Sequence, residues 1–263
     1  MQKKYLQTSL IILMIVGMCA CRQKSEIELA EKELVQIVQK GYWYEFKERL
    51  QDLLLDDDNS WEYPFKKLKG LRITASDDKK LRIYEWNDGT GNYNGGNHHI
   101  IQFQNAKGVS YCTSYEKAAC SECNEEDEDW NCRGFEVYST VLNDKNYYII
   151  EVTYMQALSW LGNRNIAIYM IETNSLVKKS LFKTEKEILS EIGFEYNVAS
   201  YYYDFVENDK DFKNDENSFD WLFRYDDKDK IIYVPLVDGF KVMKTNLLYQ
   251  WDGKYFTYKG ITK

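Results

Sequence analysis

Three stretches of this chain repeat one pattern, and that repeat limits the fold more than any other feature of the sequence. Each stretch opens with a polar Asp/Asn-Lys turn and continues into a strand-like run, and two more strands follow after a variable loop. The stretches span residues 77–111, 143–178 and 226–258. Side chains that alternate with a period of two are typical of antiparallel strands. The repeat therefore predicts three antiparallel units of three strands each, in meander order.

The last unit contains the strongest hairpin signal. Asp252-Gly253 separates two alternating runs, 246–251 and 254–258, as a tight hairpin turn requires. Hydrophobic residues make up 44% of the chain and aromatic residues 16%, so the chain can form a core and is rich in side chains that favour pleated surfaces. We predict an α+β fold, mainly antiparallel β, whose units form an open sheet or the blades of a partial propeller.

Two segments outside the repeat have helical signals. Apolar side chains between residues 26 and 55 recur every three or four positions, with Gly41 as an interruption. Thr184 is followed three residues later by Glu187, which is the capping-box pattern, and Gly193 supplies a stop signal. We predict an N-terminal helix that breaks near Gly41 and a short helix near 185–192.

The first residues have the pattern of a secretory signal. Lys3 and Lys4 precede an apolar run, which is about ten residues long and too short to span a bilayer core of about 30 Å as a helix. The sequence Met18-Cys19-Ala20-Cys21 is similar to a bacterial lipobox. Cys21 follows the small Ala20 and fits the acylated position better than Cys19, which follows Met18.

We therefore predict a lipoprotein signal peptide over 1–20, lipidation of Cys21, a tether over 21–30, and one mainly-β domain over 31–263 that includes the N-terminal helical segment. Acyl chains on Cys21 would hold the protein to a membrane. Arg22 after the acylated cysteine favours the outer membrane of a bacterial cell envelope, with the protein facing the periplasm or the exterior.

Four further cysteines cluster in one segment: Cys112, Cys120, Cys123 and Cys132. In an oxidising compartment an even, clustered set predicts two disulfides. Three pairings exist, and we favour Cys112–Cys132 with Cys120–Cys123. A four-thiolate zinc site and a redox-active Cys120/Cys123 pair are the alternatives, although the acidic run 125–129 opposes a thiolate at Cys123.

Two connections, 87–97 and 113–131, are the candidate binding loops, because binding residues often lie on loops held by rigid strands. The candidate contact residues are Tyr93, His98, His99 and Trp130. The glycines between 89 and 96 lead into an alternating strand, so they lack the helix N-terminus that holds dinucleotide phosphates. His98 and His99 are strand neighbours that face opposite sides of a sheet, so they cannot share one metal ion or form one dyad.

Charge and motifs restrict the possible partners. The net charge is −8, and it becomes about −10 once Lys3 and Lys4 leave with the signal, which argues against a nucleic-acid partner. No pair among the 42 acidic residues stands out as a catalytic pair, and no known motif for a metal or nucleotide is present. The sequence therefore predicts no catalytic residue, no metal and no cofactor.

The lipobox, the segment 81–86 with the Gly-rich loop after it, and the closing hairpin 247–256 together resemble envelope lipoproteins of Gram-negative bacteria that have no assigned activity. The resemblance covers most of the chain and implies an envelope location and a β-rich architecture. His98-His99 after the Gly-rich loop and the cysteine cluster depart from that pattern.

Three functions are consistent with these features. The leading prediction is a membrane-anchored binding module that engages a glycan or an envelope protein through the two candidate loops. The second is a carboxylate-dependent hydrolase of envelope or dietary polysaccharide, and the third is a structural subunit of an envelope complex. Two carboxylates about 5–10 Å apart in an open pocket would favour the hydrolase.

Overall fold

The computed structural model describes residues 26–56, 58–89, 96–115, 132–155, 161–197 and 223–262. The chain divides into two compact units, Met1–Leu71 and Arg72–Lys263, which we call the helical unit and the β unit. In the part of the chain that the structure describes, no helix combines the length and apolarity needed to cross a membrane.

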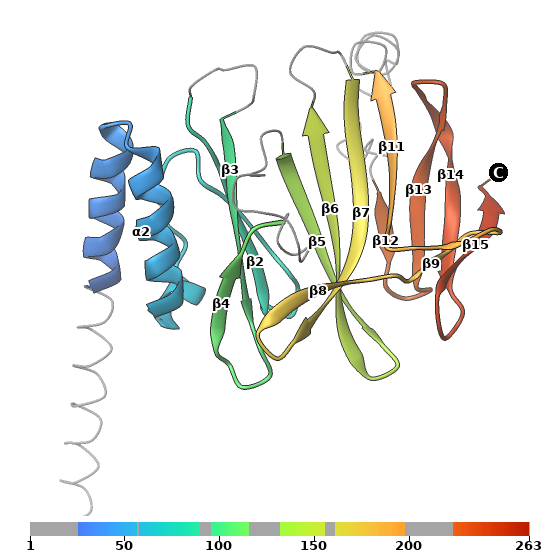
Figure 1. Cartoon of the computed structure of the whole chain (residues 1–263), viewed down its shortest axis with the longest axis horizontal. Coiled ribbons are helices and arrows are strands. Elements are labelled where there is room, and N and C mark those ends of the chain that lie inside the picture. The colour runs from blue at the N-terminus through green and yellow to red at the C-terminus, as the bar shows by residue number, and fades with distance from the viewer. Residues whose placement is uncertain are drawn as a thin grey trace, which may run out of the picture. The chain divides into compact units, whose positions relative to one another are not determined.

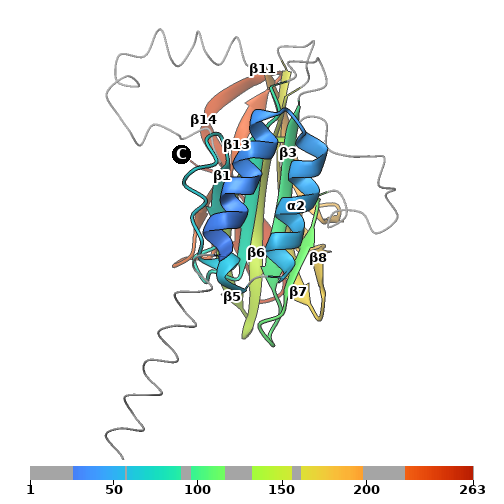
Figure 2. The same cartoon turned by 90° about the vertical axis from the view of Figure 1, so that its left-hand side faces the viewer.

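The helical unit contains the predicted helix and its interruption. Residues 26–39 form one helix, and α2 (Trp43–Asp56) forms the next, followed by the short 3-10 helix η1 (Asp58–Trp61). Figures 1 and 2 both show the two long helices side by side. The chain reverses at Gly41, whose φ of 75° lies in the left-handed region that glycine adopts without strain. Residues 26–30, at the end of the predicted tether, are helical, and Ile27 is buried on the same stripe as Leu34.

A buried glutamate fixes the chain after α2 within this unit. Glu31 accepts hydrogen bonds of 2.7 Å from the Tyr63 hydroxyl and from the Lys67 backbone N–H. Burial and the neighbouring Glu31 carboxylate raise the pKa of Tyr63, so its hydroxyl stays a donor. Since Glu31 is only 1% exposed, these contacts provide the partners that a buried carboxylate needs.

The β unit consists of three antiparallel sheets that Figure 1 shows side by side. The first sheet has the order β1-β2-β3-β4 and the second the order β11-β7-β6-β5, with β8 also paired to β7. The third has the order β10-β9-β15-β14-β13-β12, in which only β9 and β15 run parallel. The strands are β1 (Arg72–Ala75), β2 (Leu81–Asn87), β3 (Asn97–Gln104), β4 (Ser110–Thr113), β5 (Cys132–Leu142), β6 (Lys145–Met155), β7 (Leu161–Glu172), β8 (Ser175–Lys179), β9 (Phe182–Lys183), β10 (Ile188–Leu189), β11 (Glu191–Asn197), β12 (Arg224–Asp226), β13 (Ile231–Asp238), β14 (Lys241–Trp251) and β15 (Phe256–Ile261).

The predicted fold class and meander are confirmed. The three repeated units correspond to β2-β3-β4, β6-β7-β8 and β13-β14-β15. Strands that the sequence pattern did not predict extend each sheet: β1 in the first, β5 and β11 in the second, and β9, β10 and β12 in the third. One apolar core lies between the first and second sheets and includes Ile83, Ile101 and Ile150. Another joins the second and third sheets and includes Ile149 and Ile232. The sheets therefore pack in series, with both faces of the second sheet buried.

The helix predicted near 185–192 is wrong, because this segment forms a hairpin. Thr184 Oγ1 accepts hydrogen bonds from the backbone N–H groups of Lys186 and Glu187, as an N-cap does, but the Thr184 N–H donates to the Glu187 carbonyl and closes a tight turn. β10 then pairs antiparallel with β9. Gly193 does not end a helix; it lies within β11, directly opposite Asn165 on β7. The capping pattern was real, but strand pairing prevailed over a helix of about two turns.

The two ends of the β unit differ in how the strands are connected. At the turn end, tight turns join β1 to β2, β3 to β4, β5 to β6, and β7 to β8 (Figure 1). In the β5–β6 turn, Asn143 and Asp144 both have positive φ, as a type I′ hairpin requires. At the opposite end, which we call the loop end, the described strands flank the connections 88–96, 114–131, 156–160 and 198–223, and all of these except 156–160 are longer than the tight turns. The meander therefore places the candidate binding loops at one end of a rigid scaffold.

Candidate functional site

The two candidate histidines lie on β3 at the loop end. His98 is the cross-strand partner of Trp86, and His99 is the partner of Glu85. The predicted division of the two imidazoles between opposite faces of the sheet follows from this register. Each histidine therefore has a separate environment.

His98 is held in place and keeps one side open. Its ring stacks on Trp86 with 5.5 Å between the ring centroids, and its Nε2 lies 2.9 Å from Asp88 Oδ2. Because an ionised carboxylate only accepts hydrogen bonds, the neutral imidazole carries its proton on Nε2 and leaves Nδ1 as an acceptor. The side chain is 29% exposed. His98 can therefore accept a hydrogen bond from a hydroxyl or amide of a ligand.

His99 has a structural role in the packing of the β unit. It is buried, its Nε2 accepts a 2.8 Å hydrogen bond from the Tyr115 backbone N–H, and its ring contacts Phe135 at 5.0 Å between centroids. These contacts tie β3 to the start of the 114–131 connection and to β5. Of the two histidines, only His98 is positioned to touch a ligand.

Several predicted site residues lie outside the described part of the chain: Cys21, Tyr93, Cys120, Cys123 and Trp130. Cys132 begins β5, but its side chain is also outside that part. Cys112 is half-buried and makes no disulfide within the described part of the chain, and burial raises the pKa of its thiol to about 12. The two disulfides remain a prediction.

A row of carboxylates and guanidinium groups at the loop end was not predicted from the sequence. Arg72 lies between two acids, with its Nη2 2.6 Å from Glu136 Oε1 and its Nε 3.8 Å from Glu85 Oε2. Glu136 is the cross-strand partner of Glu151. Arg164 Nη1 lies 2.9 Å from Glu151 Oε1, at an angle outside hydrogen-bond geometry. We call these five residues the carboxylate row.

Burial perturbs two members of the carboxylate row. Desolvation raises the pKa of Glu85 to about 7, against the lowering effect of Arg72. Desolvation also raises the pKa of Glu151 to about 7, with Arg164 lowering it and Glu136 raising it further. Glu85 Oε2 has no hydrogen-bond partner among the described residues. Three carboxyl groups thus share two arginines, and the two buried ones hold a proton more tightly than an exposed glutamate does.

One sequence signal could have identified these glutamates. Glu85 and Glu151 each interrupt a strand whose neighbouring residues are apolar or aromatic, and in such a strand every second side chain faces a core. An acid at a core-facing position must be paired or protonated. The partners of these two glutamates, Arg72 for Glu85 and Arg164 for Glu151, are remote from them in sequence, so the sequence alone could not predict the pairing.

A pocket of about 230 Å³ lies at the turn end, between the first and second sheets. Its lining contains Lys80, Lys145 and Tyr148 but no carboxylate, so it does not have the acid pair that a glycoside hydrolase uses. Among the described residues, no group of three or more histidine, cysteine or acidic side chains is arranged to hold a metal ion.

The fold defines a mainly antiparallel β protein of three stacked sheets. No protein-family model matches the chain, and no curated protein or solved structure is significantly similar to it. The functional argument therefore depends on the geometry of the chain itself.

Proposed function

We propose that this protein is a lipid-anchored binding module of the bacterial cell envelope, held in the outer membrane by acyl groups on Cys21. Its loop end engages a glycan or an envelope protein through the connections 87–97 and 113–131. The signal-like segment supports the location, and the division of the β unit into a turn end and a loop end supports the mode of binding.

The arrangement of Trp86, His98 and Asp88 carries this proposal. A buried indole and a carboxylate fix the imidazole at the base of the Gly-rich connection, and Nδ1 is left to accept a hydrogen bond. A polar group fixed before binding loses little conformational entropy when a ligand arrives. This is the property that a recognition residue needs.

The binding proposal is tested with the mature chain and His98→Ala. The probes are an array of bacterial envelope and plant polysaccharides and a pull-down from detergent-solubilised envelope proteins. Tyr255→Ala, in the turn after β14 at the turn end, is the control variant for loss of a ring. We expect His98→Ala to weaken binding to the selected probe about tenfold, the usual cost of one specific hydrogen bond, and Tyr255→Ala to leave it unchanged. Equal binding by both variants, or turnover of a polysaccharide without retention, would refute the proposal.

The anchor is tested separately by labelling cells with a fatty acid and fractionating the membranes. We expect the wild-type chain to be labelled and membrane-bound, and Cys21→Ala to be unlabelled and released. A Cys19→Ala variant controls for the other cysteine of the lipobox and should keep both properties. Membrane retention of Cys21→Ala would exclude this anchor without bearing on the loop end.

A further inference from the structure

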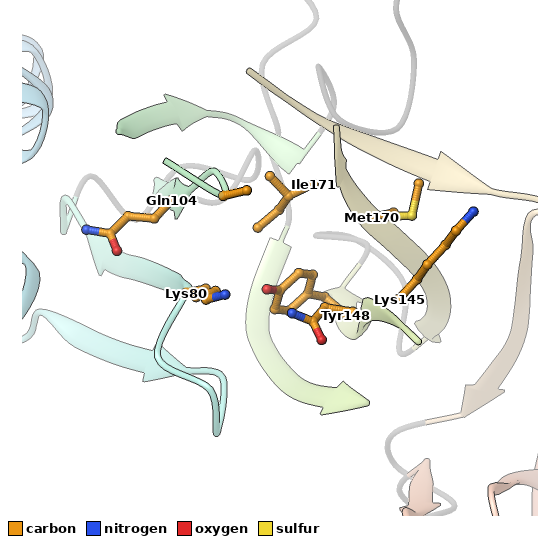
Figure 3. A pocket seen from close by; sticks show the side chains of 8 residues that line it. Lys80, Gln104, Lys145, Tyr148, Met170 and Ile171 are labelled. Carbon is orange, nitrogen blue, oxygen red and sulfur yellow. The ribbon is translucent and has the colours of Figure 1, made fainter. Parts of the chain in front are cut away.

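The pocket at the turn end has a chemical character of its own. It lies where the start of β2 and the β3–β4 turn of the first sheet approach the start of β6 and the end of β7 in the second. Figure 3 shows Lys80 and Lys145 on opposite sides of Tyr148, with the Lys145 side chain directed away from the ring. Lys80 is therefore the cation of the pocket, and Lys145 lies at its rim.

Lys80 has no anionic partner among the described residues. The nearest acid in the sequence, Asp78, is fully engaged elsewhere: Oδ1 accepts from Ser76 Oγ and from the Lys80 backbone N–H, and Oδ2 accepts a 2.9 Å hydrogen bond from the Tyr148 hydroxyl. Asp77 and Asp144 are exposed on the adjoining turns. The three donors to Asp78 are uncharged and occupy its oxygens, so what the pocket offers a ligand is the single ammonium group of Lys80.

The remaining lining groups suit a small polar ligand. Gln104 and Asn146 supply amides that can both donate and accept, while Ile171 and the buried Tyr148 form an apolar floor. The Tyr148 hydroxyl donates to Asp78, so the ring is fixed in place. A volume of about 230 Å³ is below that of pockets for drug-sized molecules, which begin at about 300 Å³, and is sufficient for one sugar ring or one small acid.

We propose that this pocket binds a small ligand that carries an oxyanion, either the carboxylate of an acidic monosaccharide or a phosphate group, with Lys80 as the residue that pairs with the charge. The Asn146 amide can bind its neutral hydroxyl groups. The site lies at the opposite end of the β unit from His98, so it does not depend on the function proposed for the loop end.

The test uses the mature chain and two sugars that differ only at one carbon, glucuronate and glucose, with inorganic phosphate as the third probe. Binding is followed by calorimetry and by chemical-shift changes at low and at physiological salt. We expect glucuronate to bind, glucose to bind at least about tenfold more weakly, and salt to weaken glucuronate binding.

Variants of Lys80 test whether this residue pairs with the negative charge of the ligand. Lys80→Gln should weaken glucuronate binding about tenfold, and Lys80→Arg should retain it, because the positive charge is kept. Lys228→Gln is the matched control, an exposed lysine on the β12–β13 turn of the third sheet. If phosphate is the only probe that binds, and this binding is lost in Lys80→Gln, the result would support the oxyanion site and identify phosphate as the group that it binds. Equal binding of glucuronate and glucose, no binding of any probe, or unchanged binding in Lys80→Gln would overturn the proposal.

Discussion

Replacing Glu85 by glutamine should stabilise the protein above neutral pH and destabilise it slightly in acid. The Glu85 carboxyl is desolvated between the first and second sheets, and this raises its pKa from 4.5 to about 7. The folded chain therefore binds a proton more tightly than the unfolded chain. Below about pH 4.5 both states are protonated and the group makes no difference, whereas stability falls as the pH rises from there through 7.

The size of the effect follows from the two pKa values. A tenfold difference in proton affinity corresponds to about 1.4 kcal/mol, so ionised Glu85 costs about 3 kcal/mol at a pH well above 7. Glutamine removes this cost, but it places an amide N–H₂ where Oε2 has no partner, at a penalty of about 1 kcal/mol. Arg72 keeps its contact with Glu136. The net gain should be about 2 kcal/mol at pH 8.5.

Urea unfolding between pH 4 and 8.5, at constant ionic strength, measures this difference. The Glu85→Gln curve should lie about 1 kcal/mol below the wild-type curve near pH 4, because the amide penalty remains there, and should rise above it as the pH increases. Glu195→Gln, at an exposed position on β11, is the control and should follow the wild type throughout. A Glu85→Gln chain that is no more stable than the wild type at pH 8.5, or that differs from it equally at both ends of the range, would refute the assignment of a buried, destabilising charge.

Two further predictions concern packing. Glu31→Ala leaves the Tyr63 hydroxyl and a backbone N–H without their acceptor, so it should destabilise the helical unit by about 3 kcal/mol, measured as faster hydrogen exchange. The control, Glu33→Ala, breaks only an exposed ion pair and should cost less than about 1 kcal/mol. Equal effects of the two variants would show that the buried carboxylate is dispensable. Gly193→Ala would place a Cβ 2.9 Å from a backbone carbonyl oxygen of β7, so we expect the free energy of unfolding to fall by about 1–3 kcal/mol, measured by thermal unfolding. Glu195→Ala is the control and should leave the melting temperature unchanged. An unchanged melting temperature in Gly193→Ala would contradict the close approach of β11 and β7.

Length alone does not decide which strands the sequence predicts, since the sequence pattern misses β5 with 11 residues and predicts β4 with four. The runs that became β2, β6 and β14 hold four or more alternating or apolar positions next to a turn signal, and they lie in the interior of their sheets. The edge strands β1 and β12 hold only four and three residues, too few to establish a period.

The helix predicted after Thr184 is wrong for a different reason. Its capping hydroxyl makes the bonds that a helix start needs, but such bonds also close a turn, and local chemistry does not distinguish the two. What decided the outcome is remote in sequence: Phe182 pairs with Phe256 on β15, and Leu189 pairs back on Phe182. Tertiary pairing that spans over seventy residues (256 − 182 = 74) cannot be read from a capping pattern.

Departures from the ordinary rules of β-sheet packing are concentrated at the loop end. At the turn end, side chains satisfy the turns that they belong to, as Asp226 does for the N–H groups of Lys228 and Asp229. At the loop end, Glu85 and Glu151 are buried with incomplete partners at a cost of several kcal/mol. Chains keep such costs mainly where they serve a site, so the carboxylate row adds an energetic reason, independent of His98, to look for the ligand at this end.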